Sequence, residues 1–358
     1  MTTQEKEQGE ETIANAIALD ILNSKFKIPP MPANGPKLMS LMRTPIDAIE
    51  IDDFVKIIDS DPGLLSMILQ LANSAYYKGF DEVYSLRAAI ARIGLQETID
   101  SANLYFFKRM FPKIPEIEGF QTQEYWAFSW ACANAARRLG HPNLGMNVNS
   151  GELYIAGLLH GIGKLILEIQ YPFEFSKCIQ TAVKLKVPVH TVVLDEFGTT
   201  DNNIASKLLG IWRIPSRVCT GIKFYQNPDL APEKDRNMAA LIQFAYSIAS
   251  MSGIGTNGDG CATSIESTWI ARQSGFLLSK KDIQEEVINE IQASLEEKSE
   301  SFTGIATQKQ ETVSDPKNGL SQQQNMKKRP NSMSTTLKQT KANGVKTGFF
   351  NWIRSLFH

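Results

Sequence analysis

The helical spacing of apolar residues is the feature that most limits the fold of this chain. From residue 11 to about residue 300, apolar side chains recur at three- and four-residue intervals, and no segment shows the two-residue alternation of a β-strand. In "DDFVKIIDSDPGLLSMILQL", Phe54, Ile57 and Ile58 share one helix face. Asp61 and Pro62 then suit the N-cap and the first position of a second helix. The pattern predicts a compact, all-α, multi-helix body.

Other helices in this region are separated by loops that contain proline and glycine. The segment "YSLRAAIARIG" predicts an amphipathic helix that Gly94 ends or bends. Segment 251–260, "MSGIGTNGDG", is expected only to connect two helices, because its glycines match no phosphate-binding motif. Further helices are predicted at 97–109, 122–139, 151–169, 173–186, 189–196, 201–211, 215–225, 236–252, 262–274 and 280–298.

Nothing in the sequence predicts secretion or insertion into a bilayer. Apolar runs end well before the roughly 18–20 residues that a membrane-spanning helix requires. The N-terminus, "MTTQEKEQGEET", lacks the basic start and apolar run of a secretory signal. The four cysteines are widely spaced, form no C-x-x-C pair and are expected to be free thiols. We therefore expect a cytoplasmic protein.

Composition divides the chain into four segments. These are an N-terminal amphipathic helix (1–24), the helical domain (25–298), a flexible basic linker (299–346) and a C-terminal amphipathic helix (347–358). From residue 316 onward the chain has eight basic side chains and no acidic one, whereas the preceding part has 29 basic and 38 acidic side chains. The linker has few large apolar side chains, so burial cannot offset its conformational entropy.

The C-terminal segment "GFFNWIRSLFH" predicts a short helix with an aromatic face. Three interpretations remain open: this helix docks in a groove of a partner protein, lies on an anionic membrane surface, or packs back on its own domain. In the first interpretation, binding is expected to involve Phe349, Phe350, Trp352, Ile353, Leu356 and Phe357.

The segment "AGLLHGIGKLIL" raises the question of an active site. Helical metal-dependent phosphohydrolases commonly hold divalent metals with a histidine, an adjacent His-Asp pair and a distant aspartate. Of the four histidines here, only His160 lies in a strongly apolar helix, and the next residue is Gly161 rather than an aspartate. A single histidine in such a helix is more typical of a core residue than of a metal ligand. We expect no metal, no cofactor and a helix that breaks or packs closely at Gly161.

Several linked segments give the chain a family resemblance. They are "KIPPMPANGPKLMSLM", "IIDSDPGLLSMILQLANSAYY", "AAIARIG", "AGLLHGIGKLIL" and "ASKLLGIWRIPSRV". Together they resemble the HDOD domain over residues 25–298, a helical relative of the HD phosphohydrolases found in bacterial signalling proteins. The resemblance implies the HD-like helical fold and a regulatory role without hydrolase activity.

The chain departs from the family pattern at its motif positions. Gly161 replaces the usual aspartate, and Asp201 stands where relatives often have a histidine. Tyr225 and Gln226 replace a His-His pair, and Phe128 takes the place that HD enzymes give their first histidine. We therefore interpret His160, Gly161, Asp201 and Phe128 as a degenerate motif. The leading hypothesis is a non-catalytic bacterial signalling module that acts by protein–protein interaction.

Two alternatives are kept beside this hypothesis. One is a regulator that associates peripherally with the inner membrane through its basic tail and aromatic helix. The other is a divergent metal-dependent phosphodiesterase or phosphohydrolase, in which Asp195, Glu196 and Asp201 accompany His160. No nucleic-acid partner is expected, because basic residues of the domain are interleaved with acidic ones. The signal, the partner and the oligomeric state are not predicted.

Overall fold

The computed structural model describes residues 31–311, apart from gaps of one to three residues between residues 32 and 263, and describes side chains as far as Glu296. The described residues form helices and no β-strand; one isolated antiparallel bridge joins Ile117 to Phe120. The all-α prediction is thereby confirmed. The predicted helix 1–24, the C-terminal helix 347–358 and most of the linker lie outside the described residues.

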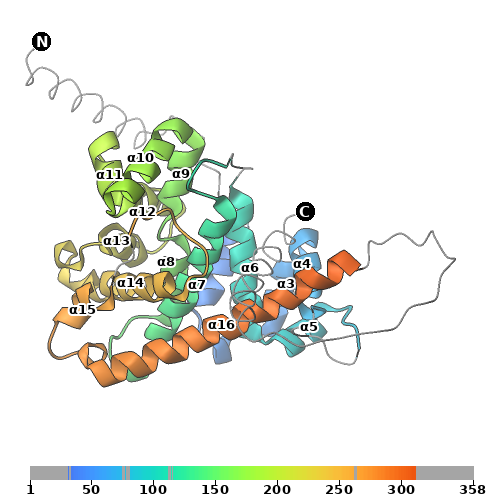
Figure 1. Ribbon diagram of the computed structural model, residues 1–358. Helices are drawn as coiled ribbons and strands as arrows, with labels where there is room; N and C mark the ends of the chain where they lie inside the picture. The colour runs from blue at the N-terminus through green and yellow to red at the C-terminus, as the bar shows by residue number, and fades with distance from the viewer. Residues whose placement is uncertain are drawn as a thin grey trace, which may run out of the picture.

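The first part of the fold contains four helices of 8 to 11 residues and one of 16 residues (Figure 1). They are α2 (Gly35–Arg43), α3 (Ile51–Asp59), α4 (Pro62–Ala72), α5 (Leu86–Ile93) and α6 (Leu95–Met110). Helix α4 begins as predicted, because the Asp61 side chain accepts hydrogen bonds from the backbone nitrogens of Gly63 and Leu64 at 3.0 and 3.1 Å. Gly94, with φ of 94°, ends α5 and lets the chain turn directly into α6.

The second part surrounds α7 and contains the predicted motif segments. Its helices are α7 (Thr122–Leu139), α8 (Ser150–Leu159), α9 (Ile162–Gln170), α10 (Pro172–Leu185), α11 (Val189–Phe197), α12 (Asp201–Ile211), α13 (Ser216–Phe224), α14 (Glu233–Ser252) and α15 (Trp269–Arg272). Helices α8 and α14 pack on α7. Gly157 permits the close approach of α8, since a Cβ atom at this position would lie 2.7 Å from the Cα atom of Ala133.

Short 3-10 helices connect several of these elements. They are η1 (Ile46–Ala48), η2 (Pro142–Leu144), η3 (Pro228–Leu230), η4 (Ile265–Ser267) and η5 (Leu277–Ser279). The helix predicted at 262–274 is instead η4 followed by the single turn of α15. The break occurs at Thr268, whose hydroxyl caps α15 while Gln243 accepts a hydrogen bond from the Trp269 nitrogen at 2.6 Å.

The last described helix, α16 (Lys281–Glu311), extends along one edge of the molecule (Figure 1). Its apolar face, which includes Ile291 and Leu295, is buried against the domain, and the helix contacts α7 and α14. The helix ends thirteen residues beyond the predicted end at 298. No proline interrupts the chain before Pro316, so backbone hydrogen bonding can continue into the polar sequence.

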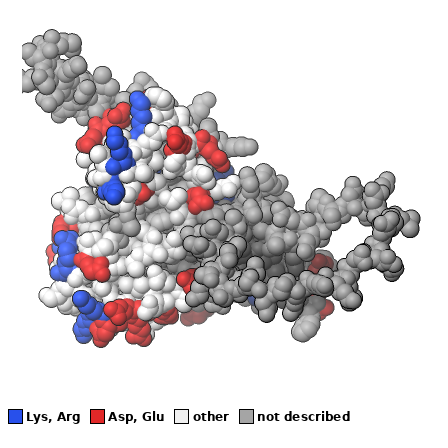
Figure 2. All heavy atoms as spheres, in the orientation of Figure 1, with Lys and Arg blue, Asp and Glu red and all other residues white. Residues whose placement is uncertain are grey.

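One cluster of buried apolar side chains runs from Leu38 in α2 to Leu295 in α16. In the part of the chain that the structure describes, no helix combines the length and apolar content needed to cross a bilayer. Charged side chains on the face shown in Figure 2 gather over α10 and α11 and along α16, and much of the surface between them is uncharged.

Candidate functional site

The predicted motif lies at a junction between two helices. Helix α8 ends at Leu159 and α9 begins at Ile162, so His160 and Gly161 form the connection. The backbone of Gly161 (φ −105°, ψ 10°) lies outside the helical region, as the break predicted there requires. A Cβ atom on Gly161 would lie 3.0 Å from the Tyr125 ring. An aspartate side chain at this position would therefore press against Tyr125.

His160 is fully buried and enclosed by aromatic rings. Its ring centroid lies 5.9 Å from that of Phe128, 5.6 Å from that of Tyr225 and 5.6 Å from that of Tyr246. The structure thus brings together His160 and two of the positions, Phe128 and Tyr225, at which the sequence departs from the family pattern. These rings supply no imidazole nitrogen for a metal and occupy the space around His160.

The His160 ring is held in one tautomer. Its Nδ1 atom lies 2.7 Å from the backbone oxygen of Gly157, which can only accept a hydrogen bond. Burial lowers the pKa of His160 to about 4, so the imidazole is neutral at pH 7. Nδ1 therefore carries the proton, and Nε2 is an acceptor that receives no hydrogen bond from the described residues.

A buried ion pair lies next to this junction. The side chains of Lys164 and Asp259 are only 2% and 6% exposed, and Lys164 Nζ lies 3.4 Å from Asp259 Oδ1. Lys164 also donates to the backbone oxygen of Asn257 at 2.9 Å, while Asp259 Oδ1 accepts from the Val189 nitrogen at 2.9 Å. The Asn257 side chain donates to Tyr246 Oη at 2.6 Å, which connects the ion pair to the rings around His160.

This ion pair corrects the role predicted for segment 251–260. We expected only a connection between helices, but Asn257 and Asp259 place the segment inside the buried site. The sequence signal was Lys164, a charged residue in an otherwise apolar helix segment. A buried ammonium group requires a buried partner, and such a residue predicts a carboxylate elsewhere in the chain.

Asp201 is the first residue of α12 and is fully buried. Close contact of α9 with α12 places it there. Gly163 permits this contact, because a Cβ atom at its position would lie 1.9 Å from the Asp201 backbone oxygen. Neither carboxylate oxygen of Asp201 receives a hydrogen bond from another described residue. Burial raises the pKa of Asp201, while the nearby charges of Lys164 and His190 oppose that change.

The alternative ligand set is not assembled. Asp195 and Glu196 are exposed on α11, because the opposite face of that helix buries Val193 and Phe197. Their side chains therefore lie at the surface, whereas His160 is fully buried.

Few donors for a divalent metal remain at the positions of the predicted motif, where His160 Nε2 and the Asp201 carboxylate are left. Within the described ranges, no three His, Cys, Asp or Glu side chains come together as a metal-binding group. Gly161 contributes no side chain, Phe128 contributes no donor, and the ammonium group of Lys164 already neutralises Asp259. We therefore derive no catalytic step through a metal at this site.

The buried imidazole predicts a pH-dependent stability. The folded pKa of His160 lies below its ordinary value of about 6.5, so the unfolded chain binds the proton first. His160 should therefore cost no stability above pH 6.5 and should lower the free energy of unfolding by about 2–4 kcal/mol as pH falls to 4. His160→Asn removes this titration and keeps a donor for Gly157. Urea unfolding from pH 7 to pH 4 should give a flatter profile for the variant; parallel profiles would contradict the assignment.

Comparison with known families identifies this helical domain. The family model of the HDOD domain matches residues 28–228, which is more than half of the chain. The chain therefore belongs to the HDOD domain family.

Solved structures share this fold. The crystal structure of an HDOD domain protein of unknown function from Geobacter sulfurreducens is 22% identical, covers 80% of this chain and 98% of that chain, and has a TM-score of 0.62. A candidate signal transduction protein from Marinobacter aquaeolei VT8 is 18% identical over 80% of this chain and 64% of that chain, with a TM-score of 0.64. At these identities the likeness shows the fold alone.

Two further proteins are similar to this chain. A candidate phosphohydrolase from Shewanella amazonensis SB2B is 21% identical over 78% of this chain and 93% of that chain, with a TM-score of 0.54. An uncharacterized protein of Treponema pallidum (strain Nichols) is 23% identical over 243 residues, which is 66% of this chain. The chain spans 44% of the length of that relative.

Proposed function

We propose that this HDOD protein is a non-catalytic signalling or regulatory module that acts by protein–protein interaction. The observation that carries the proposal is the closed surrounding of His160. The rings of Phe128, Tyr225 and Tyr246 enclose the imidazole, and all four side chains are buried. A hydrolase needs an open position at which substrate and an activated water meet, and this arrangement provides a packed core instead.

The similarity to known proteins supports a regulatory role in part. The Marinobacter relative is a candidate signal transduction protein. The Shewanella relative is a candidate phosphohydrolase, so hydrolysis is the competing function that an experiment must address.

Surface features support contact with another protein. Four large apolar side chains are exposed on the adjacent helices α10 and α11: Phe173, Val183, Leu185 and Leu194. A second contact element is the proposed C-terminal helix, whose aromatic residues suit a groove on a partner. In this proposal the protein works in the cytoplasm, and the helix docks on protein rather than on lipid.

The contact proposal predicts a specific effect of the aromatic face. In the full chain, Trp352→Ala should reduce recovery of the main protein partner at least about tenfold, because an aromatic anchor commonly contributes 2 kcal/mol or more to binding. Asn351→Ala, one residue away on the opposite face of the predicted helix, should leave recovery unchanged. Pull-downs from soluble and membrane fractions measure both variants.

The same pull-downs separate the alternatives. Equal recovery by both variants would contradict a role for the helix in partner binding. Loss of membrane association in 0.5 M salt, with no protein partner affected by Trp352→Ala, would favour the membrane-surface function instead.

A further inference from the structure

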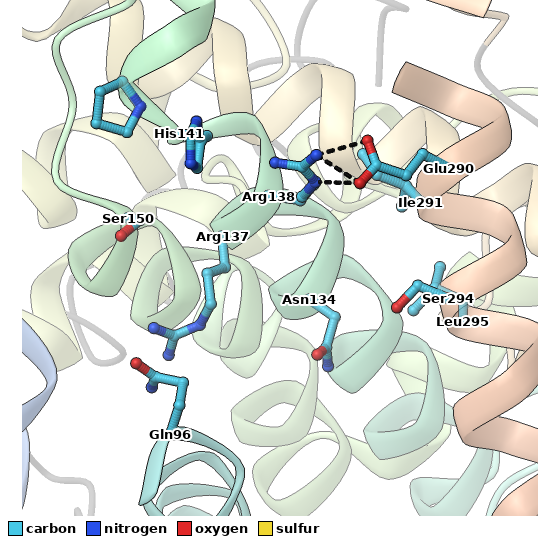
Figure 3. A pocket seen from close by; sticks show the side chains of 11 residues that line it. Gln96, Asn134, Arg137, Arg138, His141, Ser150, Glu290, Ile291, Ser294 and Leu295 are labelled. Atoms are coloured by element: carbon cyan, nitrogen blue, oxygen red, sulfur yellow. Dashed lines mark hydrogen bonds and ion pairs between the residues drawn. The ribbon is translucent and has the colours of Figure 1, made fainter. Parts of the chain in front are cut away.

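A second polar site lies at the opposite end of α8 from His160. A cavity of about 370 Å³ opens between α7, the start of α8 and α16. Helix α8 has ten residues and is therefore about 15 Å long, so this cavity is separate from the buried motif. Figure 3 shows Arg137 and Arg138 of α7 at this cavity, with Glu290 and Leu295 contributed by α16.

Arg137 is fixed in place at the cavity. Its guanidinium forms an ion pair with the buried Asp100 and lies over the Tyr154 ring, with 4.4 Å between Cζ and the ring centroid. Gln96 donates to the same Asp100 carboxylate at 3.0 Å. The Arg137 side chain is 19% exposed, so it presents a rigid positive edge to the cavity.

Arg138 is held by an ion pair with Glu290 that a phosphate group can replace. Its Nε and Nη2 atoms both donate to the Glu290 carboxylate, and the Nε to Oε1 distance is 3.0 Å. This two-pronged geometry is also the geometry in which arginine binds phosphate. The side chains of Arg138 and Glu290 are 41% and 53% exposed, so water and salt screen the attraction between them and reach the pair from solvent. An incoming phosphate can therefore displace Glu290 at small cost.

The other walls of the cavity suit the organic part of such a ligand. Pro142, Ile291 and Leu295 line the apolar side of the cavity, where Ile291 and Leu295 are almost fully covered by the domain, and His141 and Ser150 add polar groups. The volume falls in the range of sites for small ligands, and this combination of a few charged groups with apolar walls is typical of them.

We propose that this cavity binds a small phosphorylated metabolite with a ring system, of the size of a mononucleotide, whose phosphate replaces Glu290 on Arg138. Because Glu290 lies on α16, binding releases the ion pair that joins α16 to Arg138 of α7. The site then gives the domain a chemical input at the helix that precedes its C-terminal tail. The binding itself does not depend on the proposed partner contact.

Two substitutions test the competition between Glu290 and phosphate. In the full chain, Glu290→Gln frees Arg138 and should tighten binding of adenosine or guanosine 5′-monophosphate about 3–10-fold. Arg138→Gln removes the phosphate contact and should weaken binding at least about tenfold. Both variants lose the same ion pair, so a purely structural role would shift them in the same direction. Isothermal titration calorimetry measures the affinities, and Arg87→Gln, which breaks an exposed pair with Asp52, is the matched control.

Other results of the same titrations would overturn the proposal. The proposal is overturned if neither nucleotide binds the wild type or Glu290→Gln at millimolar concentration, or if Arg138→Gln binds as well as the wild type. Inorganic phosphate is the third probe. If it binds as tightly as the mononucleotides, the apolar walls are not used and a ring-bearing ligand is ruled out.

Discussion

Replacing Lys164 with methionine is expected to lower the free energy of unfolding by about 3–5 kcal/mol. The substitution keeps most of the side-chain volume but leaves the buried Asp259 carboxylate without its cation. Asp201 lies in the same buried region, and its pKa is already raised by burial. Removing the ammonium group therefore leaves acidic groups with less compensation in a medium of low polarity. Urea unfolding at pH 7 measures the loss.

Two comparisons isolate the ion pair. Lys56→Met makes the same change in an exposed pair, Lys56 with Asp53 at 2.9 Å, and should leave stability nearly unchanged. The double variant Lys164→Met, Asp259→Asn removes both charges and should be more stable than Lys164→Met alone. If Lys164→Met unfolds at the same urea concentration as the wild type, the two groups do not form a buried pair.

The second large effect is expected for Gly163→Ala. The added methyl group would overlap the backbone oxygen of Asp201, which cannot move without shifting α12 away from α9. Forced repacking of this kind costs about 1–3 kcal/mol and sometimes more, and contact with backbone places this variant at the upper end. The measured quantity is again the free energy of unfolding in urea.

Gly210→Ala is the matched control for this prediction. Gly210 lies within α12, and a Cβ atom there would meet no other atom within 4 Å. Alanine should therefore stabilise the helix by about 0.5–1 kcal/mol. Opposite signs for the two glycines are the expected result, and a neutral Gly163→Ala would mean that α9 and α12 are not in close contact.

Local patterns predicted most of the helices because their causes are local. The Asp61 cap, the helix end at Gly94 and the break at Gly161 all depend on residues within one or two turns. The end of α16 was not predicted, since a polar composition alone does not stop a helix. The one-turn α15 was missed because Gln243, 26 residues away, binds the backbone at its start.

The candidate site, too, could be predicted from the sequence only in part. The family resemblance placed Phe128 and Tyr225 at motif positions, and in the structure both rings lie against His160. The partner of Lys164 was not predicted, because Asp259 is 95 residues distant and lies in a loop with no pattern of its own. Only the folded arrangement of α9 and the segment after α14 brings the two charges together.

We propose that this HDOD protein does not hydrolyse phosphate esters. The direct measurement is turnover of cyclic nucleotides, nucleotide monophosphates and bis-p-nitrophenyl phosphate by the full chain with Mn²⁺, beside the His160→Asn variant with its fold verified by circular dichroism. We predict that wild type and variant both match the rate of buffer with metal alone. Turnover by the wild type that His160→Asn abolishes would contradict the claim and make the buried junction an active site.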